Sequence, residues 1–134
     1  MQNLSNKRER LSDELRQLLK SIGTVRSIHE DSYLFHQGMD AKEMYLIKSG
    51  LIQISMLSSE GEEMVLRICR TDDIVGELTL FWDDPKYLLN AKIIESGEVF
   101  VINIDKLQKE VHRSLVWKKT VNNNTTNKID KVVV

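Results

Sequence analysis

The sequence predicts a single domain of the α+β class that is mainly β: an antiparallel β-roll of the jelly-roll type between an N-terminal helix and a short C-terminal helix. The first observation is the length, because 134 residues suffice for one ordinary domain and not for two. The second is that apolar residues follow helical spacing only towards the two ends of the chain. The third is that apolar and polar residues alternate in between, with turn residues about every 12 positions, as in sandwiches and rolls.

The first segment, residues 1–23, is expected to form an amphipathic helix. Its large apolar residues recur at helical spacing and would share one face: Leu11, Leu15, Leu18, Leu19 and Ile22. Gly23 follows the last of them, where helices commonly close with a glycine in the left-handed conformation. We therefore expect this helix to end at Gly23.

The central segment, residues 24–104, is expected to form the strands of the roll. Three runs alternate with a period of two: Ile52, Ile54 and Met56; Met64, Leu66 and Ile68; Phe100, Ile102 and Ile104. Five pairs of turn residues separate the strands: Ser49-Gly50, Glu60-Gly61, Asp72-Asp73, Asp84-Pro85 and Ser96-Gly97. Short strands at this spacing favour antiparallel pairing over βαβ units.

A second helix is expected over residues 105–118. Asp105 is the predicted N-cap, and Gln108 stands where it would complete a capping box. One helical face would consist of Leu107, Val111 and Leu115. Residues 119–134 are rich in Asn and Thr and have no aromatic residue, so we expect a disordered or frameshifted tail.

Composition excludes several classes of protein. The hydrophobic fraction of 41% and the charged fraction of 29% are typical of a soluble globular protein, for which we expect the cytoplasm. No apolar run approaches the roughly 18 residues of a membrane span, and residues 1–8 lack the apolar stretch of a secretory signal. The only cysteine, Cys69, has no partner for an internal disulfide and is expected to be a packing residue.

The net charge of −1 is unevenly distributed along the chain. Residues 30–110 contain sixteen Asp and Glu but only eight Lys and Arg, which is a net charge of −8. The segments before and after carry +3 and +4. An acidic middle without a basic stripe is a poor surface for a phosphate backbone, so we expect no direct binding of nucleic acid by this chain.

Gly76 is the one glycine outside an apparent turn or cap, because it lies inside the apolar stretch 74–81. A glycine in such a stretch indicates either a positive φ angle, as at a bulge, or close approach of another group to the backbone. The residues alone leave a bulge and a ligand contact as equal alternatives.

Several motifs occur in a characteristic order. They are Tyr45-Leu46-Ile47-Lys48-Ser49-Gly50-Leu51-Ile52-Gln53-Ile54, Gly61-Glu62-Glu63 and Asp73-Ile74-Val75-Gly76-Glu77-Leu78. This order resembles the cyclic-nucleotide-binding β-roll of the CRP/FNR transcription regulators over about residues 28–110. Leu66-Arg67-Ile68-Cys69-Arg70, Pro85-Lys86-Tyr87-Leu88 and Val101-Ile102-Asn103 are similar to the Fnr-type anaerobic regulators of Gram-positive bacteria.

The resemblance implies a ligand pocket. In nucleotide-binding members a Gly-Glu pair, matched by Gly76 and Glu77, opens a phosphate-binding segment whose glutamate accepts a hydrogen bond from the ribose hydroxyl. An Arg-Ser-Ala sequence near its end neutralises the cyclic phosphate. The expected pocket residues are Gly76, Glu77, Leu78, Asn90 and Ala91.

This pocket departs from the nucleotide-binding pattern. The stretch 87–91 retains only the alanine, and no arginine occurs between Arg70 and Arg113. The flanking Lys86 and Lys92 lack the planar fork that matches phosphate oxygens. We therefore expect no cyclic-nucleotide binding and no cofactor, with Glu77 as a structural hydrogen-bond acceptor.

Catalytic and metal chemistry has little support in the sequence. His29, His36 and His112 are never within metal-ligand spacing of one another, and no base accompanies Cys69 or any serine. A single cysteine also cannot hold the iron–sulfur cluster with which Fnr-type regulators sense oxygen. We expect neither an enzyme nor a metal protein.

The resemblance implies a role in transcription regulation. Members of the family continue into a long dimerisation helix and a helix-turn-helix that reads the major groove. This sequence departs from that pattern soon after Glu110, so we expect a truncated chain or a reading frame shifted near residue 111. The expected function is that of the sensor or effector domain of a CRP/FNR-like transcription regulator, without the DNA-binding half of such a regulator. The alternative is an interaction module that forms a homodimer, or a mixed dimer with a full-length regulator, through helix 105–118.

Overall fold

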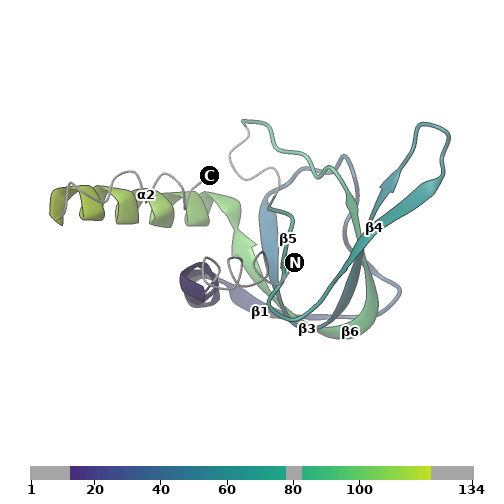
Figure 1. Cartoon of the computed structure of the whole chain (residues 1–134), viewed down its shortest axis with the longest axis horizontal. Coiled ribbons are helices and arrows are strands. Elements are labelled where there is room, and N and C mark those ends of the chain that lie inside the picture. Colours follow the sequence, from purple (N-terminus) through teal and green to yellow (C-terminus); the bar gives the residue numbers. More distant parts are fainter. Residues whose placement is uncertain (1–12, 78–82, 122–134) are drawn as a thin grey trace, which may run out of the picture.

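Two long antiparallel strands, β3 and β6, form the frame of the molecule (Figure 1). The computed structural model describes residues 13–77 and 83–121. After a helix over residues 13–22 the elements are β1 (Thr24–Ile28), β2 (Tyr33–Phe35), β3 (Glu43–Leu57), β4 (Glu63–Cys69), β5 (Ile74–Val75), β6 (Asn90–Asn103) and α2 (Ile104–Val121). The predicted fold class is confirmed.

The sheet closes into a roll because each long strand pairs with different partners along its length. The main path runs β1-β6-β3-β4, while β2 also pairs with β6 and β5 also pairs with β3. All of these pairs are antiparallel. β3 and β6 pair from Glu43 opposite Asn103 to Ser55 opposite Asn90. Because this pairing extends along the whole roll, both strands bend along their length.

Two predicted turns are wrong, because Ser49-Gly50 lies inside β3 and Ser96-Gly97 lies inside β6. The two segments face each other where the β3–β6 register is irregular. A Cβ atom at Gly97 would lie 2.2 Å from the Ser49 carbonyl oxygen, and one at Gly50 would lie 2.6 Å from a carbonyl oxygen of β6. These glycines therefore allow two bent strands to cross closely, and they do not end the strands.

The strands bury apolar side chains on two sides. Inside the roll is a cluster of Ile28, Phe35, Ala41, Tyr45, Ile47, Ile52, Ile54, Cys69, Val75, Tyr87, Ala91, Ile93, Val99 and Val101. A second cluster, beneath the helices, consists of Leu19, Met44, Leu46, Ile102, Ile104 and Leu107. Alternation in β6 divides its residues between the two, so Val101 faces the roll and Ile102 faces the helices.

β4 forms where the alternation predicts a strand, yet its apolar residues are exposed. Met64, Leu66 and Ile68 expose 56%, 45% and 36% of their surface, and Cys69 is the buried residue of this strand. Figure 1 shows the β3–β4 hairpin projecting beyond the rest of the sheet. Alternation identifies a strand correctly, but burial requires a second layer, and none covers this hairpin within the described part of the chain.

The N-terminal helix covers one side of the second cluster. Its residues Leu15, Leu18 and Ile22 pack there together with the fully buried Leu19. The Gly23 amide donates to the Leu19 carbonyl oxygen at 2.8 Å, but its φ angle is not left-handed, so that detail of the prediction is wrong. The chain passes directly into β1 and needs no reversal after the helix.

α2 begins one residue before, and ends three residues after, the predicted range 105–118. The side chain of Asn103 accepts a hydrogen bond from the Lys106 amide at 3.0 Å, so Asn103 is the N-cap and the prediction of Asp105 is wrong. Asp105 lies in the first turn, where its charge suits the helix dipole. The predicted tail beyond residue 121 is outside the described residues. Neither helix within residues 13–77 and 83–121 is long and apolar enough to cross a membrane.

Replacing Asn103 with alanine is expected to destabilise the protein by about 1 kcal/mol, since the Lys106 amide would lose its side-chain acceptor. Urea denaturation followed by circular dichroism measures this loss. Asn103→Asp keeps an acceptor and should lose only a few tenths of that amount. An aspartate variant as unstable as the alanine variant would contradict the capping role.

Candidate functional site

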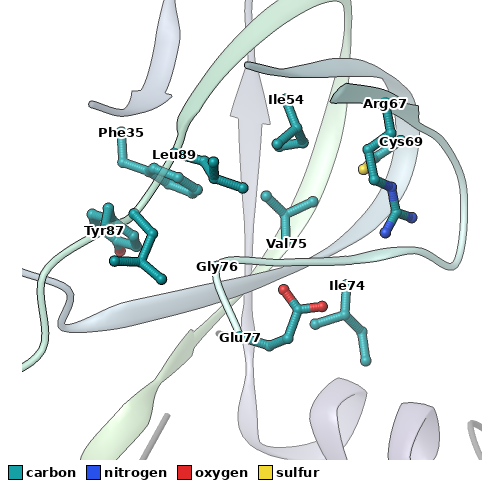
Figure 2. Close-up of a pocket in the computed structure, with 11 residues that line it drawn as sticks. Phe35, Ile54, Arg67, Cys69, Ile74, Val75, Gly76, Glu77, Tyr87 and Leu89 are labelled. Atoms are coloured by element: carbon teal, nitrogen blue, oxygen red, sulfur yellow. The ribbon is translucent and has the colours of Figure 1, made fainter. Parts of the chain in front are cut away.

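A cavity of about 120 Å³ opens in the roll between β4, β5 and the segment that leads into β6 (Figure 2). Its lining comes from five parts of the chain that are distant in the sequence. The lining residues are Phe35, Ile54, Arg67, Cys69, Ile74, Val75, Gly76, Glu77, Tyr87, Leu88 and Leu89. Most are apolar, and Arg67 and Glu77 are the two charged members.

Gly76 turns the chain immediately after β5. Its φ angle of +86° lies in the left-handed region, which a residue with a Cβ atom rarely adopts. An added Cβ atom would only make ordinary contacts of 3.4 Å with the rings of Phe35 and Tyr87. Backbone conformation, and not lack of space, therefore requires glycine here. The turn places the next residue, Glu77, at the cavity.

Stacked aromatic rings form one wall of the cavity. The rings of Phe35 and Tyr87 are 3.8 Å apart between centroids and inclined by 9°. The Tyr87 hydroxyl donates to the Glu43 carbonyl oxygen at 2.5 Å, and the Tyr45 hydroxyl donates to the Glu43 carboxylate at 3.2 Å. Burial raises the pKa of Tyr87, so it remains a neutral hydrogen-bond donor at physiological pH. The hydrogen bond to Glu43 therefore fixes the position of the Tyr87 ring in this wall.

Arg67 is the residue that sequence reasoning missed. It enters the cavity from β4, and its guanidinium lies 3.6 Å from the Asp73 carboxylate. The signal was present in the alternation, because Arg67 and Cys69 are two residues apart on one strand and so face the same side. The stretch between Arg70 and Arg113 contains no arginine, and the cation of the cavity comes from another strand, β4.

Burial dominates the electrostatics of the cavity. It raises the pKa of the Glu77 carboxyl, and the nearby Asp73 carboxylate raises it further, while the Glu77 amide and Arg67 lower it. Burial also raises the pKa of the Cys69 thiol, which makes this thiol a poor nucleophile. Two carboxyl groups and one guanidinium therefore surround the polar end of the cavity. This balance does not favour an anion.

The comparison with known families decides what kind of roll this is. Residues 25–114 match the family described as the cyclic nucleotide-binding domain. The chain belongs to this family. The site just described is therefore the cavity of a cyclic nucleotide-binding domain, and the predicted relationship to CRP/FNR regulators is confirmed by the relatives below.

Curated relatives of this cyclic nucleotide-binding domain include regulatory proteins. The chain is 55% identical over 101 residues to an anaerobic regulatory protein of Bacillus subtilis (strain 168), covering 75% of this chain and 42% of that protein. It is 40% identical over 78 residues to the cAMP-activated global transcriptional regulator CRP of Salmonella typhimurium, covering 58% of this chain and 37% of CRP. The chain thus spans less than half the length of either relative.

Solved structures share the fold of this cyclic nucleotide-binding domain. The c-di-GMP responsive global regulator CLP of Xanthomonas campestris superposes with a TM-score of 0.68 at 20% identity, covering 89% of this chain and 57% of CLP. The sensor domain of the transcriptional regulator DNR of Pseudomonas aeruginosa gives a TM-score of 0.59 at 26% identity, covering 87% of this chain and 79% of that chain.

The residues expected to form the pocket of this cyclic nucleotide-binding domain separate in the structure. Gly76 and Glu77 line the cavity, and Leu78 lies outside the described residues. Asn90 and Ala91 lie in β6, away from the lining: the Asn90 side chain accepts a hydrogen bond from the Gln37 amide at 2.8 Å, and Ala91 is fully buried in the core. The three residues before Asn90 provide the lining instead: Tyr87, Leu88 and Leu89.

The described residues offer few other sites for chemistry. Within residues 13–77 and 83–121, no three His, Cys, Asp or Glu side chains are grouped so that they could hold a metal ion. Lys86 pairs with Asp40 at the surface and is not among the residues that line the cavity.

Proposed function

We propose that this chain is the sensor domain of a CRP/FNR-like transcription regulator in the cytoplasm, and that its input is not a cyclic nucleotide. The names of the curated relatives support a role in transcription. In regulators of this kind a helix-turn-helix reads DNA, and we propose no DNA contact for the residues described here. No catalytic role is proposed.

One observation carries the second half of the proposal. In the stretch 87–91, where the resemblance places an Arg-Ser-Ala phosphate clamp, the residues that line the cavity are Tyr87, Leu88 and Leu89. None of these side chains can neutralise a phosphate. Arg67 is the one cation of the described lining, and it already pairs with Asp73. A phosphate would also lie beside the Glu77 carboxyl, which opposes negative charge.

Calorimetry with cyclic AMP tests this proposal. We expect no saturable heat, which corresponds to a Kd of about 1 mM or weaker. The CRP protein of Salmonella typhimurium, which is named as cAMP-activated, serves as the positive control under the same conditions. Micromolar binding by this chain would refute the proposal, because the apolar stretch 87–89 would then be compatible with a cyclic phosphate.

A chain of contacts would carry the state of the cavity to α2. The Tyr87 hydroxyl bonds to the carbonyl of Glu43, and Glu43 pairs with Asn103, the N-cap of α2. The neighbouring Ile104 amide donates to the Lys42 carbonyl oxygen at 3.0 Å. A ligand that displaces Tyr87 would therefore shift the first turn of α2. We propose that this is how an input biases the helix.

A second candidate function follows from the position of α2. Leu107 and Val111 pack on the roll, and beyond them the helix projects away from the sheet (Figure 1). Its 18 residues span about 27 Å. Such a helix could pair with the same helix of another chain, which would make this protein an interaction module that forms homodimers or mixed dimers.

Size-exclusion chromatography with light scattering separates the two candidates. The chain is run alone and after mixing with the full-length anaerobic regulatory protein of Bacillus subtilis. A species with one copy of each would support the interaction module. A monomer that forms no mixed species would exclude it and leave the sensor function.

A further inference from the structure

We propose that the cavity binds a small uncharged molecule of about the size of one aromatic ring, with a polar head group between Arg67 and Glu77. The inference rests on the proposed sensor function and names the chemical class of its input. Three features support it: the volume of the cavity, the chemistry of its walls, and the balance of charge at its polar end.

The volume sets the size of the ligand. The cavity of about 120 Å³ is slightly smaller than an apolar protein cavity of roughly 150 Å³ that accommodates benzene. Pockets for drug-sized ligands begin at about 300 Å³. A single ring is close to the limit of this volume, so its one small substituent must extend towards the exposed end of the cavity at Arg67, whereas a nucleotide belongs to the larger range.

The walls of the cavity are apolar on the side away from the charges. Phe35 and Tyr87 form the aromatic wall, Leu89 follows Tyr87 in the same segment, and Ile54 and Val75 come from two further parts of the chain. In Figure 2 these rings lie on the left, whereas the Arg67 guanidinium and the Glu77 carboxylate lie to the right and below. The ligand is therefore expected to be amphipathic, with its ring against the aromatic wall.

The polar end requires a head group that both donates and accepts hydrogen bonds. Arg67 has only donors, and the Glu77 carboxylate has only acceptors. An anion would be repelled by Glu77 and by Asp73, which lies 3.6 Å from Arg67. A cation would be attracted by the two carboxyl groups, but Arg67 would oppose it and it would lose its hydration in a largely apolar cavity. A neutral amide satisfies both partners without adding a charge to a largely apolar cavity.

Three probes of nearly identical shape test the charge preference. Benzamide is neutral, benzoate is an anion and benzamidine is a cation. Each is titrated into the isotopically labelled chain, and the amide resonances are followed by NMR. We expect benzamide to shift the resonances of Gly76, Glu77 and Leu88 saturably, and benzoate and benzamidine to bind about tenfold more weakly.

Two variants test the location. Leu88 exposes 40% of its surface, so Leu88→Trp should fold normally and block the cavity, abolishing the benzamide shifts. Glu77→Gln removes the negative charge and should strengthen benzoate binding several-fold. Glu62→Gln, on the exposed tip between β3 and β4, makes the same chemical change outside the cavity and should alter neither probe.

The outcomes separate this inference from the proposed function. Absence of saturable benzamide binding, tighter binding of either charged probe, or full binding by Leu88→Trp would overturn the inference. None of these results affects a sensor that fails to bind cyclic AMP. Binding of cyclic AMP that displaces benzamide would overturn both.

Discussion

Replacing Gly97 with alanine is expected to prevent the roll from folding stably, at a cost of about 4 kcal/mol or more. The new Cβ atom would lie 2.2 Å from the carbonyl oxygen of Ser49 and 2.7 Å from the amide nitrogen of Gly50. Both neighbours are backbone atoms, so no side chain can rotate away. Relief would require β3 and β6 to separate at the point where they cross.

Gly61→Ala is the matched control for this substitution. Gly61 has a φ angle of +85°, but nothing lies within 4 Å of an added Cβ atom. The free energy of unfolding should fall by only about 1–2 kcal/mol, which is the cost of a left-handed backbone for a residue with a Cβ atom. Thermal unfolding followed by circular dichroism compares the two. If Gly97→Ala lost no more stability than Gly61→Ala, close crossing of the strands would not be what selects Gly97.

Replacing Ile102 with alanine is expected to cost about 2–5 kcal/mol, since it removes three methyl or methylene groups from a tightly packed site. Ile102 is fully buried beneath the helices, in one cluster with Leu19 of the N-terminal helix and Leu107 of α2. The loss should therefore loosen both helices together with the sheet. Urea denaturation gives the free energy, and the helical signal shows whether the helices melt in the same transition.

Ile94 provides a control on the same strand. It exposes 36% of its surface, so Ile94→Ala removes the same groups at a site that water already reaches. We expect a loss of about 1 kcal/mol or less. Equal losses for Ile94→Ala and Ile102→Ala would mean that the contact between helices and sheet contributes no more than a surface position.

The alternation of apolar residues predicted the strands well. It also indicates which face of β4 carries Arg67. Arg67 lies between Leu66 and Ile68 and so on the opposite face of β4, which is the face that turns towards the cavity. Arg67 becomes a cavity residue because β4 and β5 border the same cavity. Alternation with a period of two predicts on which face of a strand a residue lies. It does not predict which residues of other segments lie across the cavity from it.

The predictions of turns and of the N-cap were wrong where one residue type is common in two different structural roles. Ser-Gly pairs mark turns, yet a glycine also allows close backbone approach, and Gly50 and Gly97 serve the second purpose. Asn103 and Asp105 are both good N-caps, and the register of β6 against β3 decides between them by keeping Asn103 in the strand. In each case the residue type allows two structural roles, and the pairing with the neighbouring strand determines which role the residue has.

By itself, the sequence determined the roll, its two helices and the family, because these depend on local periods and on motifs in a fixed order. Gly76 and Glu77 line the cavity, and their role as ligand contacts stays a prediction. Only the tertiary structure decided which residues share the cavity. It removed Asn90 and Ala91 from the lining and added Arg67. The physical reason is that a cavity forms between segments distant in the chain, and its volume and charge depend on how those segments pack.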